Sequence, residues 1–205
     1  MQTQVLSTDN PTAFKHAHDV LRNGGLVAFP TDTVYGLAAL TFCPEGIHGL
    51  FIAKRRNSSK AIAVLLHSPS ELDQVTSQVN QVAQRLINRF WPGPLTIVLP
   101  KHPNIPDVLA PSSKIGVRIP DHPIASQLLR LTGPLAVTSA NISNQPNTNT
   151  AQEVLDQLKG RIHLVLDGGR SPGGQPSTVV DCTSPELNIL RPGPISIEEL
   201  TAALQ

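Results

Sequence analysis

Apolar segments of two different periods alternate along this chain, and this alternation constrains its fold more than any other feature. Short apolar runs typical of buried strands stand between longer segments in which apolar residues recur every three to four positions. The clearest helical pattern covers residues 79–90, where apolar side chains occupy positions 79, 82, 83, 86, 87 and 90. Because strands that alternate with helices bury their apolar faces against each other, the pattern predicts a sheet covered by helices.

Residues that start and stop regular structure mark the ends of several segments. Asn10-Pro11 predicts the beginning of a first helix, and Asn23-Gly24-Gly25 predicts its end. Asp121 predicts the beginning of a helix over residues 123–131. Further helices are predicted near residues 47–51, 79–90, 151–158 and 198–204. Strands are predicted near residues 26–29, 61–66, 95–99, 115–119, 135–137, 162–166, 178–180 and 187–190.

Length and composition argue against several classes of protein. At 205 residues the chain can form one substantial core, and no change in composition divides it into two domains. No apolar run is long enough to span a bilayer, the N-terminus lacks a secretory signal, and two cysteines are too few for a disulfide framework. We therefore expect a soluble protein of the reducing cytoplasm. The net charge of +1 and the 3% aromatic content give no support to a nucleic-acid surface, and leave that alternative open.

A cluster of positive charge stands out at residues 54–60, which read Lys-Arg-Arg-Asn-Ser-Ser-Lys. Such a cluster is more often an exposed loop than the lining of a site that receives an anion. Side chains two positions apart diverge by about 200° on a helix but share a face on extended chain. If Lys54 and Arg56 bind one ligand, the helix that precedes them must therefore end near Ala53.

Two other stretches carry polar side chains two positions apart beside a predicted strand. They are Thr31-Asp32-Thr33 and Ser139-Ala140-Asn141. Their polar groups either satisfy the backbone of turns or meet at the crevice where layered folds bind ligands. Basic residues with hydroxyl and amide groups suit a ligand that bears phosphate. No Walker or GxGxxG motif, no metal-binding spacing of histidines and no Ser/His/Asp signature is present, so we predict no metal ligand and no nucleophilic side chain.

Residues 167–177 hold four of the fourteen glycines between two predicted strands. This segment is either a flexible connection or a mobile cover over a site, with glycines as hinges and Ser177 at its closing end. The sequence favours neither alternative.

Seven short motifs in a fixed order point to a known family. They are Phe29-Pro-Thr-Asp-Thr-Val-Tyr-Gly-Leu37, Lys54-x-Arg56, Trp91-Pro-Gly-Pro-Leu-Thr96, Val117-Arg-Ile-Pro-Asp-His-Pro123, Thr138-Ser-Ala-Asn-Ile-Ser143, Ser177-Thr-Val-Val-Asp181 and Leu190-Arg-Pro-Gly193. Each motif alone is a weak signal, but their order resembles that of the YrdC-like threonylcarbamoyl-AMP synthases over about residues 10–200.

The resemblance implies a fold and a reaction. The expected fold is of the α/β (α+β) class: one YrdC-like domain over residues 10–200, with a twisted mixed sheet flanked by helices, a concave positively charged site and no C-terminal extension domain. The implied reaction joins L-threonine, bicarbonate and ATP, with Mg²⁺, into threonylcarbamoyl-AMP and pyrophosphate. The product would pass to tRNA threonylcarbamoyl transferase proteins, and weak direct binding of RNA or tRNA stays open.

Because the reactants are all anionic, the resemblance implies that the protein neutralises and aligns them. The implied ATP ligands are Lys54, Arg56, Lys60, Asn141 and Arg191. The implied threonine ligands are Thr33, Arg118, Thr138 and Ser177, with Arg118 paired to the carboxylate. The implied catalytic residues are Lys54, Arg56, Ser139 and Asn141.

The chain also departs from the pattern of the family that it resembles. Many members carry a histidine near the amino acid at the position of Leu65, and a proline at that of Asn57. Two alternatives remain: a non-catalytic RNA-binding relative, and a carbamoyl transferase like the similar domain of hydrogenase maturation proteins. The short length and the two cysteines argue against the second alternative, whose members carry acylphosphatase and zinc-finger regions.

Overall fold

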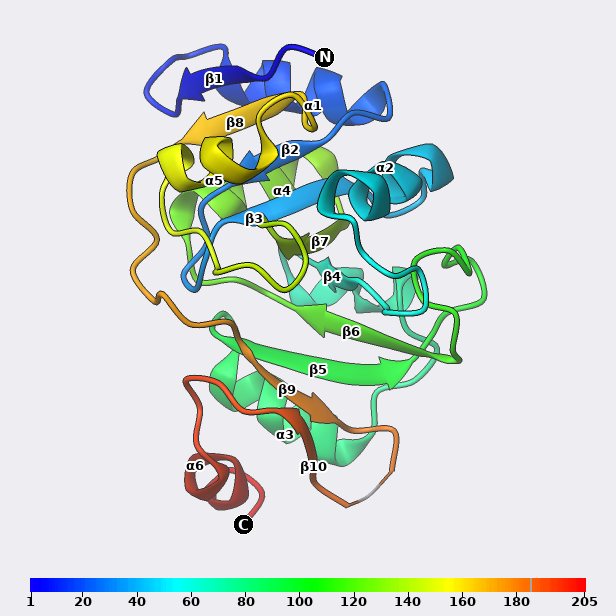
Figure 1. Ribbon diagram of the computed structural model, residues 1–205. Helices are drawn as coiled ribbons and strands as arrows, with labels where there is room; N and C mark the ends of the chain where they lie inside the picture. Colours follow the sequence, from blue (N-terminus) through cyan, green and yellow to red (C-terminus); the bar gives the residue numbers. More distant parts are fainter. Residues whose placement is uncertain (185) are drawn as a thin grey trace.

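The computed structural model describes residues 1–184 and 186–205. Ten strands of this part of the chain form one mixed sheet, which twists strongly from β1 to β10 (Figure 1). The strand order is β1-β8-β2-β3-β7-β4-β6-β5-β9-β10. The strands are β1 Gln4–Ser7, β2 Val27–Phe29, β3 Gly36–Leu40, β4 Ala63–Leu65, β5 Leu95–Pro100, β6 Lys114–Arg118, β7 Leu135–Ser139, β8 Leu164–Asp167, β9 Thr178–Asp181 and β10 Asn188–Arg191.

Helices cover both faces of the sheet, which confirms the predicted architecture. They are α1 Ala13–Arg22, α2 Pro44–Lys54, α3 Gln81–Phe90, α4 Pro123–Thr132, α5 Ala151–Leu158 and α6 Ile197–Ala202, with a 3-10 helix η1 at Pro69–Gln74. Apolar side chains of α2, α3 and α5 pack into one buried cluster with one face of the sheet, and those of α1 and α4 pack into a second cluster on the other face. In the described residues, no helix combines the length and apolar character that a bilayer crossing requires.

The second cluster covers only half of its face of the sheet, and a cavity lies on the uncovered half. Its strand residues come from β2, β3, β7 and β8, and Leu65 of β4 lies at its boundary. Beyond Leu65 the same face continues onto β6, β5 and β9 with Gly116, Thr96 and Val179, which line a cavity instead. A Cβ on Gly116 would lie 3.2 Å from Thr96 Cγ2, so the glycine keeps this floor hollow.

Most predicted elements are present, and α5 coincides with its predicted range. The strand β3 was not predicted, because Gly-Leu-Ala-Ala-Leu lacks the β-branched and aromatic residues typical of strands. It is a strand because it pairs with β2 and β7 on its two sides. The short edge strand β1 and the helix η1 were also missed.

Two predicted helix starts were wrong by one or two residues. The Asn10 side chain accepts a hydrogen bond from the backbone N–H of Thr12 at 3.0 Å, so it forms a turn before α1, and Thr12 is the N-cap. At α4 the N-cap is His122 rather than Asp121, with Pro123 at the first helical position. Proline fits there because that N–H has no helical partner.

Candidate functional site

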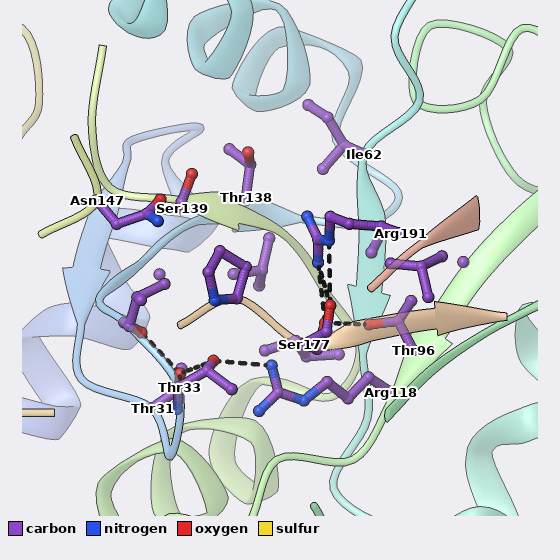
Figure 2. A pocket seen from close by; sticks show the side chains of 18 of the residues that line it. Thr31, Thr33, Ile62, Thr96, Arg118, Thr138, Ser139, Asn147, Ser177 and Arg191 are labelled. Carbon is purple, nitrogen blue, oxygen red and sulfur yellow. Dashed lines mark hydrogen bonds between the residues drawn. The ribbon is translucent and has the colours of Figure 1, made fainter. Parts of the chain in front are cut away.

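A cavity of about 330 Å³ opens on the uncovered half of the sheet. Its floor comes from six neighbouring strands, β3, β7, β4, β6, β5 and β9, which contribute Gly36, Val137, Ala63, Gly116 and Val98 among others. Alternate side chains of a strand share one face, so the lining includes position pairs such as 63 and 65 or 116 and 118. Hydroxyl groups and guanidinium groups surround this small, apolar floor (Figure 2).

Arg118 is fixed at one end of the cavity and is only 5% exposed. Its Nε donates to the carbonyl of Gly93 at 2.9 Å, its Nη1 to Thr33 Oγ1 at 3.0 Å, and its Nη2 to the carboxylate of Asp32. A guanidinium has five N–H groups, so these three bonds leave one N–H free on each terminal nitrogen. Burial lowers the pKa of Arg118 and the ion pair with Asp32 opposes this, so the side chain stays charged.

The hydroxyl groups of Thr31 and Thr33 form a chain beside Arg118 (Figure 2). Thr31 Oγ1 donates its one proton to the carbonyl of Val34 at 2.7 Å. Thr33 Oγ1 must therefore donate in the 3.0 Å bond between the two hydroxyls, while it accepts from Arg118. Both O–H groups are thus in use within the described structure.

Arg191 enters the cavity from the last strand and is held by Ser177. Its Nε and Nη2 donate to the carbonyl of Ser177 at 3.1 and 2.8 Å, and Nη2 also donates to Ser177 Oγ at 3.1 Å. The hydroxyls of Ser177 and Thr96 are 2.8 Å apart (Figure 2). Burial, followed by the charges of Arg118 and Arg56, lowers the pKa of Arg191, so the three guanidinium groups repel each other across one space.

Arg56 reaches the cavity because α2 ends just before it. Arg55 adopts a left-handed conformation with φ of 51°, which turns the chain out of the helix. The Arg56 side chain then donates to the carbonyls of Lys60 and Ala61 at 3.4 and 2.9 Å, and burial lowers its pKa. The cavity is therefore a polar, electropositive space that suits an anionic ligand.

Comparison with known proteins shows the family of the chain. A family model named Sua5_yciO_yrdC, with the description "Telomere recombination", matches residues 19–193. The chain belongs to the Sua5/YciO/YrdC family. It is 38% identical to the threonylcarbamoyl-AMP synthase of Bacillus subtilis, over 98% of this chain and 59% of that protein. It is 39% identical to the threonylcarbamoyl-AMP synthase of Pyrococcus abyssi, over 88% of this chain and 54% of that one.

A solved structure of the same family has the same fold. The crystal structure of P. abyssi Sua5 complexed with L-threonine superposes with a TM-score of 0.94 at 35% identity, covering 100% of this chain and 61% of that chain. The chain thus spans between half and two thirds of the length of these relatives.

Seven of the ten residues that the motifs of the Sua5/YciO/YrdC family single out lie in the cavity lining. They are Thr33, Arg56, Arg118, Thr138, Ser139, Ser177 and Arg191. The convergence of these residues, which come from six separate stretches of sequence, agrees with the expected concave positive site. Their individual roles stay predictions.

Lys54, Lys60 and Asn141 lie outside the cavity lining, and their roles in binding stay predictions. Lys54 is 1% exposed and donates to the carbonyls of Ser139 and Asn141, the second at 2.5 Å. Its side chain turns inward because α2 continues through Lys54 and leaves the helix only at Arg55. The Asn141 amide donates to the carbonyls of Ile142 and Gln145, and Lys60 is exposed.

Lys54 makes the stability of the fold depend on pH. Burial, and then the charge of Arg56, lowers its pKa from 10.5 to about 7. In the unfolded chain Lys54 keeps its proton up to its ordinary pKa of 10.5. Between pH 7 and 10.5 the unfolded state therefore binds more protons than the folded state, so the free energy of unfolding rises with pH. When the pH is raised from about 7 to about 9.5, the free energy of unfolding of wild type should increase by about 1 to 3 kcal/mol relative to that of Lys54→Met.

Urea unfolding of both proteins at the two pH values measures this gain. Substitution at the exposed Lys60 by methionine is the matched control, because it removes a lysine without removing a buried charge. An equal stability difference between wild type and Lys54→Met at both pH values would contradict the assignment.

The glycine-rich segment lies against the cavity and is attached at several points. The Tyr35 hydroxyl donates to the carbonyl of Gly169 at 2.6 Å, and the backbone N–H of Gly174 donates to the carbonyl of Thr33 at 2.7 Å. A Cβ on Gly173 would lie 2.5 Å from the Asp32 carbonyl oxygen, so only glycine permits this close approach. The segment is therefore a packed wall in this structure, with Pro176 in the cavity lining.

Sequence reasoning missed several lining residues, among them Tyr35, Thr96 and Asn147. Thr96 had a usable signal, since it is a hydroxyl residue in an otherwise apolar strand, Leu-Thr-Ile-Val-Leu. Asn147 comes from the loop after β7, where polar residues are ordinary, and no local pattern distinguishes it.

In the part of the chain that the structure describes, no three His, Cys, Asp or Glu side chains are grouped to hold an ion. The carboxylate beside the cavity, Asp32, is paired with Arg118.

Proposed function

We propose that this chain is a threonylcarbamoyl-AMP synthase, a nucleotidyltransferase that uses ATP to activate a carbamate of L-threonine. The convergence of Arg56, Arg118 and Arg191 on one cavity carries the proposal. Three cations around a single space of about 330 Å³ match a reaction that brings a carboxylate, a carbamate and a triphosphate together. The identity of 38% and 39% to proteins of that name supports the same conclusion.

The Arg118 end of the cavity would hold the amino acid. Its two free N–H groups, one on each terminal nitrogen, can donate to the two oxygens of the threonine carboxylate. Asp32, Thr33 and the carbonyl of Gly93 fix the guanidinium plane before the substrate arrives. The relative that was crystallised with L-threonine is consistent with this assignment.

The Arg56 and Arg191 end would hold the phosphates of ATP, with Thr138 and Ser139 at the rim. Lys54 and Asn141 would act on this end indirectly. Lys54 bonds the backbone carbonyls on both sides of Ala140, and Asn141 bonds the following turn, so they position Ser139. Lys60, which is exposed beside Arg56, would contribute charge at the mouth.

Mg²⁺ would arrive with the nucleotide, because it binds phosphate oxygens readily and the described side chains form no cluster of acidic ligands for it. The residues therefore fit a metal carried by the substrate better than a metal bound by the protein.

The chemistry proceeds in two steps without a nucleophilic side chain. The threonine amine attacks the carbon of bicarbonate, water leaves, and an N–C bond gives the carbamate. A carbamate oxygen then attacks the α-phosphorus of ATP, the bond to the β-phosphate oxygen breaks, and pyrophosphate leaves. The protein lowers the barrier by holding anions together that repel each other in water.

Pyrophosphate release from ATP tests the proposal. We expect release only when L-threonine, bicarbonate and Mg²⁺ are all present, with the acyl adenylate identified by mass spectrometry. If the chain releases no pyrophosphate but binds RNA with a steep dependence on salt, it is the non-catalytic RNA-binding relative instead. If the proposal holds, the product supplies proteins that transfer threonylcarbamoyl to tRNA.

A further inference from the structure

A second cavity, of about 390 Å³, opens where the parallel strands β4 and β6 end. Leu66 and Ile119, the residues directly after these strands, line it together with Trp91. Four prolines, at positions 69, 92, 120 and 123, also line it, and their fixed φ angles keep the cavity rigid before a ligand binds. A preformed space with an apolar and aromatic lining and few polar groups is typical of a site for a small organic molecule.

The charges around the second cavity favour a neutral ligand. Among the described residues that line it there is no lysine or arginine, in contrast to the first cavity, which three guanidinium groups surround. The carboxylate of Asp121 lies in the lining and the charge of Asp32 also acts on His122, so an anion would be repelled. The helix α4 begins at Pro123 beside the cavity, and the positive end of its dipole disfavours a cation. A molecule without net charge meets neither penalty.

One polar group of the second cavity lacks a partner. The bonded groups are His67 with Ser126 at 3.3 Å, Ser68 with Ser70, and Trp91 Nε1 with the carbonyl of Leu95 at 2.7 Å. In contrast, His122 Nδ1 is buried and has no hydrogen-bond partner in the described structure. A buried polar atom without a partner costs free energy, which a ligand with a matching group recovers.

The His122 ring is neutral near pH 7. Burial lowers its pKa below the ordinary 6.5, and the charges of Asp32 and Asp121 oppose this shift without cancelling it. A neutral imidazole donates from one nitrogen and accepts at the other. A hydroxyl group pairs with Nδ1 in either case, because it both donates and accepts.

We propose that the second cavity binds a neutral aromatic molecule with a hydroxyl group, which packs against Trp91 and the prolines and bonds His122, and that this ligand is an effector of the first cavity. The site differs from the first cavity in its lining, its charge and the class of its ligand.

The two cavities are connected through one shared wall. The backbone N–H of Leu66 donates to the carbonyl of Arg118 at 2.9 Å, and that of Gly93 donates to the carbonyl of Ile119 at 2.9 Å. The Gly93 carbonyl in turn accepts from Arg118 Nε. A ligand packed against Leu66 and Ile119 immobilises the segments that orient Arg118, so it should raise the affinity of the first cavity for a carboxylate. This coupling rests on the proposed function, which places L-threonine at Arg118, whereas the second site itself does not.

Binding of phenol to the full chain tests the second site. Trp91 is the single tryptophan of the chain, so its fluorescence reports on this cavity. We expect a saturable change with phenol below about 10 mM, and binding of benzoate and of benzylammonium that is at least about tenfold weaker. The absence of saturable phenol binding, or equal binding of either charged probe, overturns the proposal.

Two variants locate the ligand. His122→Phe keeps a ring but removes the nitrogen, so it should weaken phenol binding by about tenfold and change toluene binding by less than about threefold. Because His122→Phe can disturb the start of α4, Ser126→Leu provides a second variant, which fills the cavity and should abolish the saturable change while Trp91 is retained. Unchanged phenol binding in either variant overturns the assignment. His48→Phe is the matched control, because His48 is exposed on α2 and outside the lining, and it should bind both probes as wild type does.

Titration of phenol with and without L-threonine measures the coupling. We expect saturating threonine to lower the Kd of phenol by at least about fivefold, and phenol to lower the Kd of threonine by the same factor, because coupling between two sites is reciprocal. If phenol binds and threonine leaves its Kd unchanged, the effector role is overturned. If calorimetry detects no threonine binding, the proposed function fails, whereas saturable phenol binding still supports the second site.

Discussion

Arg118→Lys is expected to lower kcat/KM for threonine by about 10²-fold to 10³-fold, mainly through a higher KM. Arg118 meets Gly93, Thr33 and Asp32 and still has two N–H groups for a carboxylate. A lysine has three N–H groups on one atom and cannot satisfy these partners and a bidentate substrate together. Initial rates of pyrophosphate release at varied threonine concentration measure the change.

Two further variants sharpen the Arg118 experiment. Arg130→Lys is the matched control, because Arg130 is exposed on α4 and away from the cavity lining, so its kinetics should equal those of wild type. Asp32→Asn keeps an acceptor for Arg118 but removes the opposing charge, and it should impair threonine binding less than Arg118→Lys does. An unchanged threonine KM in Arg118→Lys would remove Arg118 from the amino-acid site.

Gly116→Val is expected to abolish most of the activity, by at least about 100-fold, while the protein stays folded. Gly116 lies on the cavity floor in β6, and even a Cβ there would approach Thr96 Cγ2 to 3.2 Å. The two methyl groups of valine would occupy space where the reactants must align. Its backbone is not in the left-handed region and valine favours strands, so the fold should tolerate the change.

Thermal unfolding and calorimetric ATP binding of the Gly116→Val protein should be measured together. We expect a cooperative transition close to that of wild type and weakened or absent binding. Gly49→Ala is the control. Gly49 is on α2, outside the cavity lining, and its added Cβ would make ordinary contacts of 3.5 Å with Leu26. A stable Gly116→Val protein with wild-type activity would show that the reactants do not lie on this floor.

The elements of the fold were largely predictable because their signals are local. The helical period over residues 79–90 and the strand-like runs on either side need only neighbours within a few positions, and the structure has α3 and the flanking strands there. One exception is β3, whose Gly-Leu-Ala-Ala-Leu sequence carries no strand signal. Pairing with β2 and β7, which come from different parts of the chain, makes it a strand.

The sequence predicted which residues belong to the candidate site better than it predicted where their side chains point. Motif order pointed to Arg56, Arg118 and Arg191, and the structure brings all three to one cavity. The directions of the Lys54 and Arg56 side chains were not predictable, because they depend on where the helix ends. That point is set by the left-handed conformation of Arg55 and by the bonds of Lys54 to a loop 85 to 87 positions away.

The sequence by itself determined the alternation of strands and helices, the family and the set of basic and hydroxyl residues, since these depend on composition and spacing along the chain. Only the tertiary structure decided which side chains face the cavity and how their protons are shared. The position of Leu65 beside Arg118 follows from the register of β4 against β6. Register is fixed by packing between distant segments, and local sequence does not record it.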